Sequence, residues 1–422
     1  MPDIELRPRI GILPDDDGRA TPQRDRLRRA WLVLIAVSLT LLFASGVTFA
    51  SLGIPLFAMA QEFRWSEAAA GGAFLAVGLI CAATSLAPML LIPRIGARWT
   101  VTVGMILFGV GSLLASKIQT LMGFYGAAVF FGIGFALVTN ASGTYLVASW
   151  FQQQSSRMIG LYMMIGSLGG AVVPPGAGLL VASEGGWRFY WQVLAAAAML
   201  IAVLCAVLIR EPPSGGHPSS AAGDDTWGYR SFLPRPQFMI IAAAIVATQA
   251  CMLVVAGVAA PHFVQRGWSV DFAARILGLQ GLVGAVATGA SGWLTERYDP
   301  KLVLAAALLA EAAGVVLLAF AHAVWMIYAF VPVFGVGWSV TTLAGTVLLL
   351  RYFGTRSGTA AQSTIWTLAG VATAGPYLAG LAADMTGSFV PALTFLGLLL
   401  LPIALTALMM APGRLTTHAA TS

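Results

Sequence analysis

Long apolar stretches separated by short charged loops occupy almost all of this 422-residue chain. Crossing the hydrocarbon core of a bilayer, which is about 30 Å thick, takes about 20 apolar residues in a helix. Backbone groups in lipid must find hydrogen-bond partners within their own segment, so we expect each stretch to be a transmembrane helix. The twelve expected spans are residues 31–60, 68–92, 99–116, 120–150, 157–181, 189–209, 237–262, 272–295, 302–321, 323–350, 358–384 and 389–410.

Composition and charge exclude a water-soluble protein. Hydrophobic residues make up 58% of the chain and charged residues only 9%, whereas soluble domains carry about 25% charged residues. The net charge of +6 does not indicate nucleic acid, because 18 of the 23 Lys and Arg residues fall in the loops and tails on one side of the expected bilayer and five on the other. This asymmetry predicts cytoplasmic termini. The Ala-rich chain and compact loops suggest a bacterial inner membrane.

One connection is much longer than the others and divides the chain. Residues 211–236 are rich in Pro, Gly and Ser, which is the composition of a linker. We therefore predict two six-helix bundles, 30–210 and 237–411, joined by this cytoplasmic linker. The polar segments 1–29 and 412–422 are expected to be cytoplasmic tails, the first of them disordered.

The two halves repeat each other. The segment LIPRIGARW at 91–99 corresponds to LTERYDPKL at 294–302, an offset of 203 residues. Trp150 and Phe151 correspond to Tyr352 and Phe353 at an offset of 202. The prolines at 174 and 376 are also 202 residues apart. Parallel repeats of this kind predict two bundles related by a pseudo-two-fold axis along the membrane normal.

Loops at corresponding places in the two halves carry a family pattern. The loop RIGARW and the fuller copy GWLTERYDPK resemble the loop G-x-x-x-D-R-x-G-R-R of the major facilitator superfamily. Pro93 stands where the first copy should have its acidic residue. The residues that match are Arg94, Gly96 and Arg98 in the first copy and Gly292, Glu296, Arg297 and Lys301 in the second.

Three further segments are similar to the monocarboxylate and oxalate/formate porter branch of that superfamily. They are WFQQQSSRMIGLYMMIGSLGGAVVPP at 150–175, the Gly-Trp-Arg turn at 186–188, and GPYLAGLAADMTGSF at 375–389. The resemblance implies secondary active transport of a small organic acid by alternating access, coupled to protons, without a cofactor. The branch's substrate-binding Arg and the acidic residue one turn before it fall on Thr288 and Gly284. Two alternatives therefore stay open, namely an exporter of neutral or amphipathic compounds and a transport-dead membrane sensor.

Polar and aromatic residues near mid-span are the candidates for binding a substrate. In the family, helices 1, 4, 7 and 10 line the cavity, with helices 2, 5, 8 and 11 beside them. A buried amide in lipid needs a partner, so hydrogen bonding between helices is the alternative role for each residue. The candidates are Asn140, Tyr145, Tyr162, Gln249, Gln280, Trp338, Gln362 and Trp366.

Glu311 stands alone as a charged residue halfway along an apolar span, 302–321. Placing a charged side chain there costs about 2.5–3.5 kcal/mol on insertion scales. Such a carboxyl is a candidate proton carrier. The alternative is a structural hydrogen bond into helix 8 or helix 10.

Charged residues near the span ends form two further groups of candidates. His262 and Arg275 lie near the outer ends of helices 7 and 8, where they could anchor the helices at the interface or line an outer vestibule. The candidate cytoplasmic gate consists of Arg94, Arg98, Glu296, Arg297, Asp299 and Lys301.

Several classes of site are not expected. The three cysteines have no metal-ligand spacing, and we expect neither a metal nor any other cofactor. No strand precedes the Gly-rich segments, no Walker lysine follows them, and no nucleophile–base pair is visible, so neither an ATP-driven pump nor an enzyme is expected. The expected partners are the lipid bilayer, a small-molecule substrate and protons, and we expect a monomer.

Overall fold

The computed structural model describes residues 23–85, 87–151, 155–211 and 233–410. The sequence predictions for residues 1–22, for 212–232 of the linker and for the tail 412–422 lie outside these residues. All regular secondary structure in the described residues is helical, and twelve helical segments there are long and apolar enough to cross a membrane. The all-α, twelve-span prediction is confirmed.

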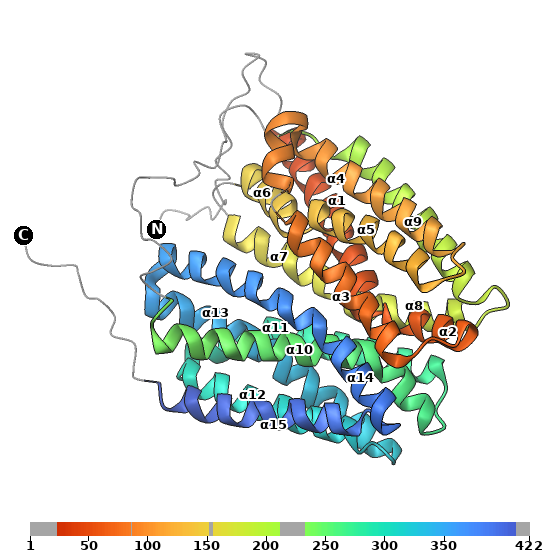
Figure 1. The fold of residues 1–422 in the computed structure, drawn as a ribbon. Helices are drawn as coiled ribbons and strands as arrows, with labels where there is room; N and C mark the ends of the chain where they lie inside the picture. Colours follow the sequence, from red (N-terminus) through yellow and green to blue (C-terminus); the bar gives the residue numbers. More distant parts are fainter. Residues whose placement is uncertain (1–22, 86, 152–154, 212–232, 411–422) are drawn as a thin grey trace, which may run out of the picture.

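The helices gather into two bundles (Figure 1). The first contains α1 (Gln23–Ser45), η1 (Gly46–Ala50), α2 (Gly53–Phe63), α3 (Glu67–Thr84), α4 (Ala87–Ala115), α5 (Leu121–Val138), α6 (Asn140–Trp150), α7 (Ser155–Ser167), α8 (Gly169–Val181) and α9 (Gly186–Leu208). The second contains α10 (Pro236–Gln265), α11 (Val270–Arg297), α12 (Pro300–Ala319), α13 (Val324–Leu368), η4 (Ala369–Ala374), α14 (Gly375–Thr386) and α15 (Val390–Leu408). We call the end at which α9 finishes and α10 begins the linker end, and the opposite end the far end.

Five of the expected spans are interrupted, although the sequence predicted each as one continuous helix. The second, 68–92, is divided between α3, which ends at Thr84, and α4, which begins at Ala87. The first passes through the π-helical turn η1, the fourth breaks at Thr139, the fifth breaks at Leu168, and the eleventh passes through the 3₁₀ turn η4. The breaks in the fifth and eleventh spans are repeat-related, because each comes just before the matched prolines, Pro174 and Pro376. Glycines lie in or beside η1, Leu168 and η4, where they weaken the helical ladder. Thr139 has neither a glycine nor a proline within three residues.

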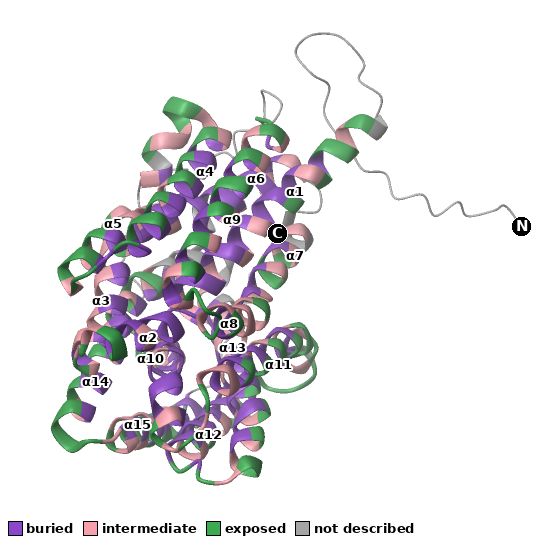
Figure 2. Cartoon of the chain, turned by 90° about the vertical axis from the view of Figure 1, so that its right-hand side faces the viewer, coloured by how far each residue is buried: buried purple, intermediate pink, exposed green. Residues whose placement is uncertain are grey.

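The outer faces of the helices are apolar along their length. On α9 the exposed side chains include Met199, Leu200, Val203 and Val207, each at least 45% exposed. Figure 2 shows exposed segments along whole helices such as α5 and α14, and not only in loops. A protein surrounded by water rarely exposes continuous apolar faces, so these faces are suited to lipid.

Aromatic rings fill the core of the first bundle. Trp191 stacks on Phe131 with ring centroids 5.2 Å apart, and Phe131 also packs on Phe108 and Phe124. Tyr190, beside Trp191, exchanges a hydrogen bond of 3.1 Å with Ser51. These contacts join α4, α5 and α9 to the segment that follows η1.

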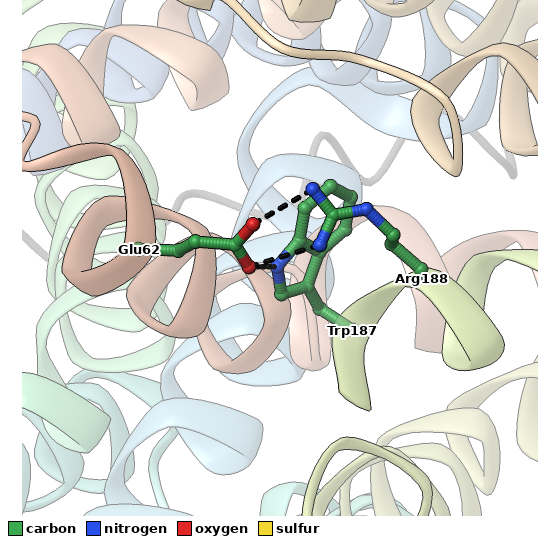
Figure 3. A network of polar contacts seen from close by, with 3 residues as sticks. All are labelled: Glu62, Trp187 and Arg188. Carbon is green, nitrogen blue, oxygen red and sulfur yellow. Dashed lines mark hydrogen bonds and ion pairs between the residues drawn. The ribbon is translucent and has the colours of Figure 1, made fainter. Parts of the chain in front are cut away.

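A polar network ties the first span to the sixth at the far end (Figure 3). The Arg188 guanidinium pairs with both carboxylate oxygens of Glu62, at 2.7 and 3.0 Å, and the Trp187 indole donates to Glu62 Oε2 at 2.7 Å. These hydrogen bonds, that from Arg188 first, hold the pKa of Glu62 below its ordinary value of 4.5. The Gly-Trp-Arg turn noted in the sequence therefore clamps α9 to α2. Gly186 starts the turn with a φ of +57°, which favours glycine.

We predict that Glu62→Gln lowers the free energy of unfolding by about 1 kcal/mol, because a bidentate pair that is partly exposed contributes little more than that. Since the pKa of Glu62 is lowered on folding, this stabilisation is present above pH 4.5 and is lost as the pH falls through the lowered value. Thermal melting in detergent at pH 7 and pH 3 measures both effects. Glu184→Gln, which changes an exposed carboxylate on the same end, should leave the melting curve unchanged. Equal melting of both variants would contradict the clamp.

Candidate functional site

Two of the predicted substrate-binding residues meet at the middle of the second bundle. The indole nitrogen of Trp338, on α13, donates a hydrogen bond of 3.1 Å to the Gln249 side-chain oxygen, on α10. Both residues lie near the midpoint of their membrane spans, Pro236–Gln265 and Val324–Phe353, and are only partly buried. The seventh and tenth spans therefore share a polar and aromatic pair at mid-membrane depth.

The ring of Trp338 rests against the eighth span at a glycine. A carbon added at Gly284 would lie 3.4 Å from Cζ3 of the Trp338 ring and 3.0 Å from Ser339 Oγ, so the indole occupies space that a longer side chain would need. One turn later, the Thr288 hydroxyl donates to the Gly284 carbonyl oxygen at 2.9 Å. Where the resemblance would place a carboxylate, the structure has Gly284, against which the Trp338 ring packs. Where it would place an arginine, the structure has Thr288, which is hydrogen-bonded to its own helix.

Glu311 lies directly behind this pair. Its side chain is fully buried, and Oε2 accepts a hydrogen bond of 2.7 Å from Thr248, the residue before Gln249. Gly337, the residue before Trp338, packs on the backbone of Glu311. Glu311 Oε1 has no partner among the described residues. The structural alternative expected from sequence, a bond into helix 8 or helix 10, is wrong in its partner, because the bond runs to helix 7.

The other candidates of the second bundle are spread over two helices. Gln280 is buried in α11, one turn before Gly284. The Gln362 side-chain nitrogen donates to the Thr346 hydroxyl at 3.2 Å, and that contact links the eleventh span to the tenth. Trp366 is 44% exposed. None of these side chains has a recorded contact with the Gln249–Trp338 pair.

The candidates of the first bundle lie around the break in the fourth span. Tyr162, on α7, is fully buried against Gly143 of α6, and its hydroxyl has no partner among the described residues. Tyr145 is partly buried beside the same core. The side chain of Asn140 lies outside what the structure describes. Tyr162 therefore packs helix on helix in this conformation.

The two vestibule candidates have different surroundings. His262 is fully buried; its Nε2 donates to the Leu318 carbonyl at 2.9 Å, and Arg266 contacts the ring and donates to the Ala319 carbonyl at 2.6 Å. Burial lowers the pKa of Arg266. These bonds satisfy the last carbonyls of α12, so the vestibule role of His262 is corrected to that of a helix-end partner. Arg275 is exposed and pairs with Asp271 on its own helix.

The predicted gate residues make their recorded contacts within their own bundles. The Arg98 backbone N–H donates to Glu211 at 3.0 Å, and the Lys301 ammonium donates to the Met410 carbonyl at 3.0 Å. Asp299 caps α12 through the Lys301 backbone N–H. The Arg297 guanidinium lies over the Trp293 ring, Arg94 is exposed, and the Glu296 side chain is outside the described residues.

The bundles meet along glycine-lined seams, of which α3–α14 and α8–α11 are the most extensive; Gly53 of α2 also lies against the Ala256 and Gly257 carbonyls of α10. In the α3–α14 seam, a carbon added at Gly71 would lie 2.7 Å from the Tyr377 backbone nitrogen, and one at Gly380 would lie 2.6 Å from that of Ala68. In the α8–α11 seam, a carbon at Gly281 would lie 2.8 Å from the Ala171 backbone nitrogen. Only residues without side chains allow backbones to come this close.

The linker end is arranged differently. Within the described part of the chain, α4, α6 and α13 make substantial contacts only with elements of their own bundle. These three helices carry the loop after the second span and the linker-end portions of the fourth and tenth spans. The structure therefore joins the bundles through the seams, and within the described residues these linker-end helices make no substantial contact across the interface.

Two residues of this arrangement could not be found from the sequence. Thr248 carries no sequence signal alone, and its importance comes from its hydrogen bond to Glu311. Asp384 lies in a recognised motif, but its hydrogen bonds to the Glu67 and Ala68 backbone N–H groups of α3 could not be read from the motif. Among the described residues, no cluster of His, Cys, Asp or Glu could hold a metal ion.

Comparisons with known proteins place this geometry in a family. The family model described as the Major Facilitator Superfamily matches residues 36–374. The chain is similar to the crystal structure of a bacterial homologue of the human lysosomal transporter Spinster, in an inward-facing and unoccupied conformation: 16% identity, TM-score 0.71, covering 92% of this chain and 96% of that one. It is also similar to a D323A mutant of the nucleoside transporter NupG, with 12% identity and a TM-score of 0.74, covering 90% and 99%. The chain belongs to the Major Facilitator Superfamily.

Proposed function

We propose that this protein is a secondary active transporter that moves a small organic molecule across a membrane by alternating access. The observation that carries the proposal is the placement of the contacts between the two bundles. Glycine seams join the bundles, while α4, α6 and α13 at the linker end pack within their own bundles. With the linker end in the cytoplasm, as the distribution of Lys and Arg predicts, this is an inward-facing state.

Two substrate classes can be weighed against the centre of the second bundle. The motifs on helices 5 and 11 support an organic acid of the monocarboxylate type. The geometry favours a neutral solute, because Gly284 and Thr288 offer no charge and an indole covers the first of them. A planar, uncharged ring could stack on Trp338 and hydrogen-bond with the Gln249 amide. We therefore put the neutral solute first and keep the organic acid as the second candidate.

Proton coupling through Glu311 fits the same geometry. The residue contacts Thr248 and Gly337, which directly precede the two members of the central pair. Gain or loss of a proton on a fully buried carboxyl changes its need for hydrogen-bond donors. The change would be felt first at α10 and α13, where it would alter the distance across the Gln249–Trp338 pair.

Transport in proteoliposomes tests the function itself. We expect purified protein to accumulate or exchange labelled uridine, a neutral ring-bearing probe, and to do so faster than labelled lactate. Higher rates for lactate would favour the organic acid. Binding without transport, seen as a probe-dependent rise in melting temperature with no uptake or exchange, would overturn the proposal in favour of a sensor.

Trp338→Ala should weaken binding of the preferred probe about two- to tenfold, since stacking on an aromatic ring contributes about 0.5–1.5 kcal/mol. The matched control is Trp325→Ala, which removes a 67% exposed Trp from the same helix. Titration of the melting temperature with the probe measures both dissociation constants. An equal effect of the two substitutions would remove the indole from the site.

Glu311→Gln should abolish accumulation driven by a pH gradient and leave counterflow exchange intact, because the amide keeps the size of the side chain but carries no titrating proton. Thr248→Val, which removes the hydrogen bond but not the carboxyl, should retain pH-driven uptake at an altered rate. Unchanged accumulation in Glu311→Gln would exclude Glu311 from coupling. Parallel loss of uptake and exchange would assign it a structural role.

A further inference from the structure

Asp384 lies near the end of α14 and reaches across to the other bundle at the far end, where α3 and α14 run side by side (Figure 1). Its Oδ1 accepts a hydrogen bond of 2.9 Å from the Glu67 backbone N–H, and its Oδ2 accepts one of 3.0 Å from that of Ala68. One carboxylate thus holds the first two N–H groups of a helix that belongs to the opposite half of the molecule.

The first four backbone N–H groups of α3 all have hydrogen-bond acceptors only when Asp384 is included. The first four N–H groups of a helix have no partner within the helix. Here the Ala69 N–H donates to the Ser66 hydroxyl and the Ala70 N–H to the Ser66 carbonyl. The remaining two N–H groups, those of Glu67 and Ala68, donate to Asp384. Ser66 therefore caps the helix from within its own bundle, and Asp384 completes the cap from the other.

These two hydrogen bonds run from one bundle to the other, whereas the other polar contacts described above stay within one bundle. The clamp at Glu62, the Glu211 contact and the bond between Trp150 and Arg210 stay within the first bundle. Those of Glu311 and Trp338 stay within the second. At the glycines of the seams the bundles meet through close packing, which is not directional.

We propose that Asp384 is the latch that holds the far end closed during transport. A carboxylate at a helix N-terminus gains from the helix dipole and from charge-assisted hydrogen bonds. It does so here only while Gly71 and Gly380 keep the two backbones in close approach. Separation of α3 from α14 leaves the carboxylate and both N–H groups to water, so the latch stabilises the far-closed state relative to the far-open one.

The inference rests on the alternating-access function proposed above, but its test measures the separation of the bundles and needs no substrate. Gln119 and Gln265 are exposed at the far end, one in each bundle. Spin labels on Gln119→Cys and Gln265→Cys, in a Cys81→Ser background that keeps the buried Cys205 and Cys251, report the distance across that end by double electron–electron resonance. We expect Asp384→Ala to raise the longer-distance population about tenfold.

Ser66→Ala is the matched control, because it removes a cap from the same helix without touching the interface. Both variants should speed amide exchange at the start of α3, and only Asp384→Ala should change the distance distribution. Asp384→Asn, which keeps one acceptor oxygen but no charge, should give an intermediate shift and serves if the alanine variant does not fold. A distance distribution identical to that of the parent in a folded Asp384 variant would overturn the latch. Loss of transport with the distances unchanged would count against Asp384 as a latch but not against the transport function.

Discussion

Close approach of backbones at the two seams is the interaction on which this conformation depends. Lipid is as apolar as a leucine side chain, so there is no hydrophobic force that drives one bundle onto the other within the bilayer. Contact must come from dispersion over surfaces that fit closely. Gly71 and Gly380 on one seam and Gly281 on the other supply that fit, because a single added carbon at any of them would overlap the opposite backbone.

The same solvent explains why Gln249, Trp338, Thr248 and Glu311 bond to one another at mid-membrane depth. An unsatisfied amide or carboxyl there carries a large desolvation penalty. The Gln249 oxygen accepts from Trp338, and Glu311 accepts from Thr248. The two pairs occupy adjacent residues on α10, Thr248 and Gln249. The proposed coupling rests on this adjacency and on the need for hydrogen-bond partners in lipid.

Much of the fold could be predicted from sequence, because span length, the repeat offsets and the loop charges are set by the bilayer and survive without side-chain detail. The interruptions at Thr139 and Leu168 could not, since the glycines beside Leu168 only permit a break and Thr139 has no glycine or proline next to it. The predicted hydrogen-bond partner of Glu311 was also wrong. Helix 9 has several neighbours, and the sequence does not show towards which of them a given face of the helix is turned. For His262 the sequence left an interfacial anchor and a vestibule residue open, and the hydrogen bond to the Leu318 carbonyl at the end of α12 could not be read from it.

The position of Asp384 at the rim of the seam, and not within it, makes a reversible latch physically reasonable. A buried ion pair would lose its partner in a medium that cannot replace it, and breaking one costs roughly 3–5 kcal/mol. Asp384 is exposed to solvent, so water takes over both oxygens and both N–H groups as the helices separate. Opening then costs only the favourable geometry and charge assistance of the two Asp384 hydrogen bonds. The latch therefore favours the far-closed state over the far-open state without blocking the change between them. Below the latch, Gly71 and Gly380 bring α3 and α14 together by close packing, which has no directional preference.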